Sequence, residues 1–215
     1  MRFAFGIFLN FFENGFGDAP GTVAETFRLA AATGLAGGSI EDSTGRPGEP
    51  IYELGLAVER VRAAVEAVRS LPFPFTVTGR AENYLVGRPD LQDTIRRLQA
   101  YQEAGADVLY APGLTNREDI EAVVRAVDRP VNVVMGLQGV QLSLAELAEI
   151  GVKRVSVGSA LSRAALGAFV RAARETYEMA PGDRVLQLTS ISFGTSAGEV
   201  WATLASGAAL GVRAH

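Results

Sequence analysis

The chain has 215 residues, of which 48% are hydrophobic and 20% charged, with a formal net charge of −4. This size and balance suit a globular domain with a sizeable core, and the mild acidity argues against nucleic-acid binding, which needs a basic surface. No apolar run reaches the roughly 20 residues of a membrane-spanning helix, and the apolar start lacks the basic region and cleavage site of a signal peptide. We therefore expect a cytoplasmic protein that binds neither nucleic acid nor membrane.

Residue types that commonly carry catalysis are scarce in this chain. There is no Cys, the only His is His215, and the only Lys is Lys153. Thiolate nucleophiles and Cys-based metal sites are therefore excluded. Any catalysis must come from carboxylates, arginines, hydroxyls, amides or a bound metal ion.

Apolar runs of strand length alternate with stretches of helical spacing along the chain. Strands are predicted at residues 5–12, 35–40, 75–78, 107–110, 130–134 and 154–157, and helices at 21–33, 56–70, 91–104, 117–127, 144–150 and 164–178. Ser143 is placed to cap the helix at 144–150 and Gly151 to close it, and Gly105 is placed to close the helix at 91–104. The stretch STGRPGEP at 43–50 is predicted to be a loop from its Gly and Pro content. The alternation predicts parallel strands with right-handed crossovers.

Two architectures fit this alternation, an open doubly wound sheet and a closed (βα)₈ barrel. No G-x-G-x-x-G follows the first strand, which weakens the dinucleotide-binding alternative. Polar residues end several different strands, as the catalytic face of a barrel requires: Glu13, Glu41, Arg80, Glu82 and Asn132. Only six strand–helix units precede residue 178. The predicted fold is therefore an α/β, (βα)₈ TIM-type barrel with two of its eight βα units unaccounted for, comprising a barrel domain at 1–180 and a C-terminal segment at 181–215 packing on or beside it.

Several stretches resemble the isocitrate lyase/phosphoenolpyruvate mutase superfamily. They are ENGFGDAP (13–20), GLAGGSIEDSTG (34–45), GRAENYLVG (79–87), RLQAYQEAGADVLYAPGL (97–114), RPVNVV (129–134) and GVKRVSVGSAL (151–161). The resemblance implies a barrel that holds Mg²⁺ at its C-terminal face, mostly through water. The ion would chelate a small α-keto or 2-hydroxy acid, and a C–C or P–C bond beside the carbonyl would be made or broken. It also implies a homo-oligomer, a dimer or a tetramer. Compared with the family, the chain lacks the first two βα units of the barrel, and the segment at 181–215 is divergent.

The resemblance assigns acidic residues to the metal. Glu13 and Glu41 match positions that face the Mg²⁺ shell, with Asp42 beside them. Oxygen ligands from carboxylates and water are those that a hard cation prefers. The first acid of the family's D-x-[DE] pair falls on Phe11, which cannot coordinate a metal.

The resemblance also assigns residues to the substrate. Arg80 matches the arginine that binds the substrate carboxylate or phosphonate, a task that suits a planar guanidinium. The segment 43–50 lies where the family keeps a gating loop that closes over the substrate and excludes water. The predicted catalytic residues are therefore Arg80, Glu82 and Asn132, and the predicted substrate-binding residues are Arg80, Asn132, Ser43 and Thr44.

Two functional hypotheses remain open. The absence of Cys rules out the K-[KR]-C-G-H motif of isocitrate and methylisocitrate lyases, so an active enzyme would resemble the oxaloacetate decarboxylase-like or phosphonopyruvate-type branches. Alternatively, Phe11 and the missing units indicate an impaired paralogue that keeps a keto-acid pocket or only a scaffold role. An incomplete barrel needs its edge strands covered, and residues 184–193 alternate as a covering strand would.

Overall fold

The computed structural model describes residues 12–135, 142–187, 200 and 203–212. The chain divides into two compact units, Met1–Ser156 and Val157–His215, and each has a sheet of its own. Apart from Phe12, the strand predicted at 5–12 lies outside the described residues, as do Phe11 and His215. The predicted division into residues 1–180 and 181–215 stays a prediction.

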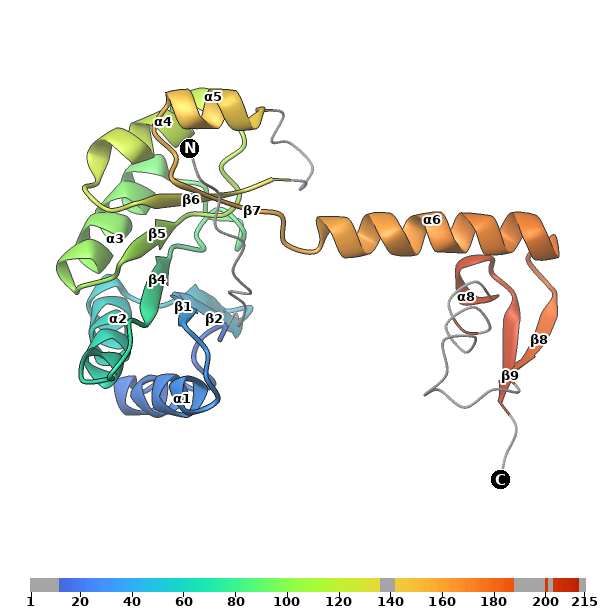
Figure 1. The fold of residues 1–215 in the computed structure, drawn as a ribbon, viewed down its shortest axis with the longest axis horizontal. Helices are drawn as coiled ribbons and strands as arrows, with labels where there is room; N and C mark the ends of the chain where they lie inside the picture. The colour runs from blue at the N-terminus through green and yellow to red at the C-terminus, as the bar shows by residue number, and fades with distance from the viewer. Residues whose placement is uncertain (1–11, 136–141, 188–199, 201–202, 213–215) are drawn as a thin grey trace. The chain divides into compact units, whose positions relative to one another are not determined.

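The first unit is built on a parallel sheet, which confirms the predicted α/β class. Its strands, in spatial order, are β1 (Gly37–Glu41), β4 (Thr76–Arg80), β5 (Val108–Tyr110), β6 (Val131–Val134) and β7 (Arg154–Ser156). All four neighbouring pairs are parallel. The spatial order follows the chain order without reversal, whereas a doubly wound sheet reverses at its switch point. The described strands therefore form a barrel-type wall (Figure 1).

Helices run along one side of this wall (Figure 1). They are α1 (Pro20–Ala32), α2 (Leu54–Arg69), α3 (Leu91–Glu103), α4 (Arg117–Ala126) and α5 (Leu144–Glu149), each within two residues of its predicted position. Ser143 and Glu146 form the capping box of α5. Gly105 and Gly151 follow their helices with φ of 102° and 94°, as helix-closing glycines do. The sequence-based boundaries of these five helices are confirmed, and side-chain caps at the starts of α3, α4 and α5 fix three of them locally.

A cluster of aromatic rings fixes where the chain enters the site. Phe12 packs edge-on against Phe27, with ring centroids 5.0 Å apart, and Phe27 against Phe75 at 5.9 Å. A Cβ built on Gly38 in β1 would lie only 2.1 Å from the Phe12 ring. Only glycine fits there, and this close approach holds the start of the described chain against β1.

The segment 43–50 is not an irregular loop, and this prediction was wrong. It forms an antiparallel hairpin of β2 (Ser43–Arg46) and β3 (Glu49–Ile51). The Thr44 hydroxyl donates to the Glu49 carbonyl across the hairpin, and Gly45, within β2 where the pairing register shifts, adopts a left-handed φ of 71° that glycine tolerates. The Gly and Pro content predicted a loop, but a local side-chain hydrogen bond stabilises the pairing of the two strands.

The second unit contains α6 (Ala160–Tyr177), β8 (Arg184–Gln187), the short α8 (Thr203–Ala205) and β9 (Ala209–Val212). Helix α6 begins four residues before the predicted start at 164. Strand β8 pairs in parallel with β9 and is not a strand of the five-stranded sheet. Residues 188–193 of the predicted covering strand lie outside the described residues. Among the helices of the described part, none is long and apolar enough to cross a membrane.

Candidate active site

Five neighbouring strands contribute one polar side chain each to a single row. Register partners in a parallel sheet lie side by side and share a face. The alternate residue Gly79 faces the helix side, since a Cβ there would lie 3.0 Å from the Tyr101 side chain of α3. The row therefore occupies the face away from the helices. We call the following register-matched residues the polar row: Glu41, Arg80, Tyr110, Asn132 and Arg154.

Arg80 is the electrostatic centre of this row. Its Nε donates to Glu82 and lies 3.5 Å from an Oε of Glu41. Its guanidinium also stacks over the Tyr110 ring, 5.2 Å from the centroid. The structure therefore brings together three residues that the sequence predicted for the site, Glu41, Arg80 and Glu82. All three side chains are largely buried, so their charges interact more strongly than on a surface.

Glu41 lies in a crowded acidic environment. Burial raises the pKa of its carboxyl from 4.5 to about 7, and the nearby charges of Glu82, Glu13 and Asp42 push it in the same direction. The guanidinium of Arg80 opposes this rise of the pKa but does not cancel it. A carboxylate in such a setting gains strongly from an added positive charge. Perturbed acids of this kind are common at functional sites.

Glu13 lies beside Glu41 on the turn that follows Phe12. Its carbonyl accepts the backbone N–H of Glu41 at 3.0 Å, its side chain is exposed, and its φ is 45°. Non-glycine residues rarely adopt a positive φ, and such residues concentrate at functional sites. The predicted pair of Glu13 and Glu41 is thus brought together.

A buried arginine that was not predicted holds this turn in place. Arg60 of α2 is 1% exposed. It donates to the carbonyls of Gly17 at 2.7 Å, Asp18 at 2.5 Å and Asn14. Its guanidinium also stacks over the Tyr52 ring, 4.2 Å from the centroid. Its helical spacing from the buried Ala57 and Ala64 is the sequence signal that could have revealed it.

Asp42, expected only beside the metal-facing acids, directs its carboxylate toward Arg97 and Tyr101 of α3. Its carboxylate accepts from Arg97 at 3.1 Å, from the Tyr101 hydroxyl at 2.5 Å and from the Glu82 backbone N–H at 2.8 Å. Adjacent residues at a strand end face opposite sides, so Glu41 and Asp42 cannot both join the row. Burial raises the pKa of Asp42, and its three donors oppose that rise. Asp42 instead fixes the main chain that carries Glu82.

Asn132 and Tyr110 meet at Ser156 on β7. The Asn132 amide donates to the Ser156 hydroxyl at 3.1 Å, and the Tyr110 hydroxyl is also hydrogen-bonded to Ser156. The Oδ1 of Asn132 is buried and has no hydrogen-bond partner among the described residues, so it is an acceptor placed for a ligand donor. The sequence predicted Asn132 but missed Tyr110 and Ser156, although Tyr110 ends a predicted strand and Ser156 lies next to the end of another.

Ser43 and Thr44 make their hydrogen bonds within the hairpin. Thr44 is 7% exposed, donates to Glu49 and accepts the Arg46 N–H at 3.0 Å. The Ser43 hydroxyl accepts the Gly45 N–H at 3.4 Å. Their predicted contacts with a substrate stay a prediction.

The acids around Glu41 suit a water-rich Mg²⁺ site better than a closed cage. No cluster of three His, Cys, Asp or Glu side chains suited to a metal ion occurs among the described residues. Magnesium commonly keeps several waters and binds through one or two carboxylates together with substrate oxygens. Glu41 and Glu13 provide two carboxylates on adjacent segments, and the raised pKa of Glu41 marks the charge that a cation would neutralise. The residues present therefore fit Mg²⁺ if the substrate supplies further ligands.

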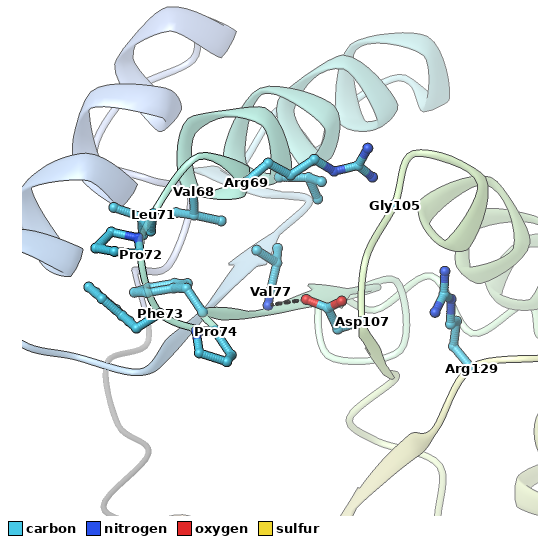
Figure 2. A pocket seen from close by; sticks show the side chains of 12 residues that line it. Val68, Arg69, Leu71, Pro72, Phe73, Pro74, Val77, Gly105, Asp107 and Arg129 are labelled. Atoms are coloured by element: carbon cyan, nitrogen blue, oxygen red, sulfur yellow. Dashed lines mark hydrogen bonds between the residues drawn. The ribbon is translucent and has the colours of Figure 1, made fainter.

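A pocket of about 460 Å³ lies at the opposite end of β4 and contains none of the predicted site residues. Figure 2 shows Arg69 and Arg129 on its walls and Asp107 between them, its carboxylate accepting the Val77 backbone N–H at 2.8 Å. Catalysis in barrels takes place at the carboxyl ends of the strands. This pocket at the amino end is therefore separate from the polar row.

Parallel strands with polar carboxyl ends define an α/β protein of the barrel class, and comparison with known proteins gives its family. The family model of phosphoenolpyruvate phosphomutase matches residues 10–177. The chain therefore belongs to this family, within the PEP mutase/isocitrate lyase superfamily. Solved members of this superfamily have the TIM-barrel fold, and it comprises Mg²⁺-dependent lyases and mutases that act on keto acids.

Three relatives illustrate the similarity. A crystal structure of a protein assigned as a lyase/mutase from Burkholderia cenocepacia J2315 is 70% identical, with a TM-score of 0.76, and the match covers 77% of this chain and 60% of that one. An oxaloacetate decarboxylase from Bradyrhizobium sp. BTAi1 is 29% identical, over 79% of this chain and 57% of the decarboxylase. A phosphonopyruvate hydrolase in complex with oxalate and Mg²⁺ is 27% identical, with a TM-score of 0.66, over 77% and 59% of the two chains. The chain thus spans less than two thirds of the length of these relatives.

Proposed function

We propose that this protein is a Mg²⁺-dependent lyase that cleaves a C–C or P–C bond beside the carbonyl of a small α-keto or 2-hydroxy acid. The observation that carries the proposal is the convergence of Arg80, Glu41 and Glu82 at the ends of adjacent strands. A guanidinium beside two buried carboxylates can bind an anionic substrate next to a cation. The relatives named above include an oxaloacetate decarboxylase and a phosphonopyruvate hydrolase, which supports both bond types as candidates.

Arg80 would bind the substrate carboxylate. Its planar guanidinium suits two parallel hydrogen bonds to a carboxylate, and its stacking on Tyr110 fixes the plane of the group. Glu82 orients the same guanidinium through Nε, and Asp42 in turn holds the Glu82 backbone N–H at 2.8 Å. This sequence of contacts keeps the anion-binding group rigid, and rigid positioning is a large part of catalysis.

Glu41 and Glu13 would hold the metal ion and its waters. Bound Mg²⁺ supplies stabilisation of the negative charge that develops on an enolate oxygen. The buried Oδ1 of Asn132 would accept a hydrogen bond from a substrate hydroxyl, which suits a 2-hydroxy acid. Burial of Arg80, Glu82 and Asn132 limits water at the reacting carbon.

An impaired paralogue is the second candidate. It is favoured by Phe11 at the position of the first acid and by the absence of a third metal-binding side chain from the described residues. Such a protein would keep the anion-binding part of the site without turnover. The predicted homo-oligomer and the cytoplasmic location also stay predictions.

The direct test is an assay of pyruvate formation from oxaloacetate and from phosphonopyruvate, each with Mg²⁺ and with EDTA. We expect Mg²⁺-dependent turnover of at least one substrate, and its loss in Arg80→Ala. Arg125→Ala, an exposed arginine of α4, is the matched control and should keep wild-type activity. The Arg80→Ala sample also corrects for metal-catalysed decay of oxaloacetate in solution. Oxalate binding by a folded protein that turns over neither substrate would favour the impaired paralogue.

A further inference from the structure

The proposed reaction leaves an enolate that must gain a proton, and the chain has few groups that could donate one. It has no Cys, and its single Lys and single His are Lys153 and His215. Lys153 precedes β7, at the amino end of the strand, far along the strand from the catalytic face of a barrel. Among the described residues of the polar row and its partners, Tyr110, Glu41 and Glu82 are the titratable side chains that can carry a transferable proton.

Tyr110 occupies the middle of the polar row. It is the last residue of β5 and the register partner of both Arg80 and Asn132. It is 6% exposed, its ring lies under the Arg80 guanidinium, and its hydroxyl is hydrogen-bonded to Ser156. The phenol therefore lies directly beside the group that we assign to the substrate carboxylate.

Two guanidinium groups influence this phenol from different strands. Arg80 on β4 and Arg154 on β7 both favour its ionised form, as does the hydrogen bond to Ser156, while burial and the charge of Glu82 favour the neutral form. Burial has the largest effect and raises the pKa of Tyr110 above 10, so the phenol is protonated at neutral pH. A phenolate formed during turnover would be stabilised by both guanidinium groups.

Glu41 and Glu82 are less suited to this role. Burial raises the pKa of Glu82, and the hydrogen bond from the Arg80 Nε opposes that rise. The carboxylate already engages Arg80 and is therefore less free than the phenol to deliver a proton to the substrate. Glu41 is the group that a bound cation would keep ionised. A neutral phenol held between cations is the remaining donor, and it retains its proton until negative charge develops nearby.

We propose that Tyr110 is the proton donor of the lyase reaction, delivering its hydroxyl proton to the carbon of the enolate that bond cleavage leaves behind. This inference rests on the proposed function. In the step, the phenol O–H bond breaks and a C–H bond forms at the former enolate carbon. The electron pair of the enolate C=C makes the new bond, and the carbonyl C=O is restored. The resulting phenolate takes a proton from solvent water before the next turnover.

The test is solvent deuterium exchange into the methyl group of pyruvate, followed by proton NMR with Mg²⁺ present. In this exchange the protein removes a methyl proton to form the enolate and then returns a deuteron to the same carbon. These two steps are the proposed proton transfer in reverse and then forward, so the same group must carry out both. We expect Tyr110→Phe to slow the exchange by about 100-fold or more, the usual range for removing a general acid. Its oxalate affinity and thermal unfolding should stay close to wild type, because the phenyl ring still supports Arg80. Tyr84→Phe, in the segment between β4 and α3, is the matched control and should exchange at the wild-type rate.

The possible outcomes separate this inference from the function on which it rests. Exchange by Tyr110→Phe within about twofold of wild type would overturn the role of Tyr110 and leave the lyase proposal intact. Wild-type protein that binds oxalate but neither exchanges pyruvate nor cleaves either substrate would overturn both. If Tyr110→Phe does not fold, 3-fluorotyrosine at position 110 provides the second variant. Its more acidic phenol should move the basic limb of the exchange–pH profile to lower pH, and an unmoved limb would overturn the proposal.

Discussion

Replacing Glu41 with glutamine tests the electrostatics of the site, because it removes a buried charge with little change of shape. Burial and neighbouring acids raise the pKa of Glu41 from 4.5 to about 7 in the folded protein. Between these pH values the folded protein keeps a proton that the unfolded chain has lost. This residue therefore contributes a stability that falls as pH rises from about 4.5 and levels off above pH 7.

The expected size follows from the same shift of the pKa. At about 1.4 kcal/mol per pH unit, the raised pKa of Glu41 lowers the free energy of unfolding by about 3 kcal/mol at pH 8 and by about 1 kcal/mol at pH 5. Glu41→Gln should exceed the wild type in free energy of unfolding by these amounts. A gain of stability on loss of a functional charge is a recognised trade-off.

The measurement is urea denaturation followed by circular dichroism at several pH values from 5 to 8, with EDTA present. Glu66→Gln, at an exposed position of α2, is the matched control and should follow the wild type at every pH. An advantage of Glu41→Gln that does not grow with pH would mean that Glu41 is not electrostatically crowded, and the reasoning about the site would be refuted.

Three further predictions concern the same region. Asp42→Asn should cost about 3–5 kcal/mol of unfolding free energy in urea, because it removes the more deeply buried of the two carboxylates that pair with the Arg97 guanidinium. Asp93→Asn, at the less buried carboxylate of the same network, should cost less, about 1 kcal/mol, and equal costs would contradict this. Gly38→Ala should lower the free energy of unfolding by about 1–3 kcal/mol, because the added methyl group overpacks against the Phe12 ring. Gly55→Ala has open space around it and should be neutral or stabilising by up to about 1 kcal/mol. Mg²⁺-dependent oxalate affinity, measured by calorimetry, should fall below pH 7 by up to about tenfold per pH unit as protons compete for Glu41, and a flat profile would argue against Glu41 as a ligand.

The fold was predictable because its signals are local. Helical apolar spacing, the Ser143 cap and the glycines after two helices gave boundaries that the structure matches within two residues for α1 to α5. The hairpin at 43–50 was missed because it depends on a bond between Thr44 and Glu49 that no composition rule reveals. The start of α6 was placed late because the polar residues of its first turn do not follow the apolar spacing.

The site was predictable only in part, because it depends on register between strands. The resemblance supplied Glu41, Arg80 and Asn132, and strand register then aligned them in one row. Tyr110 and Arg154 complete this row, but a sequence alone does not reveal which residues of different strands become partners.

The partners of Asp42 and the role of Arg60 were not predicted, for a related reason. The alternation of side chains at the end of β1 turns Asp42 toward Arg97 and Tyr101. Arg60 stabilises the turn through backbone carbonyls that are about 40 residues away in sequence. Such contacts appear only once the chain is folded.

The central claim, that Arg80 and a Mg²⁺ ion near Glu41 bind a small keto acid, is tested most directly by calorimetric titration of oxalate into the purified chain with and without Mg²⁺. We predict binding that requires Mg²⁺, disappears in Arg80→Ala and persists in Arg125→Ala. A cooperatively folded protein that binds no oxalate in the presence of Mg²⁺, or binds it equally well without the ion, would contradict the account.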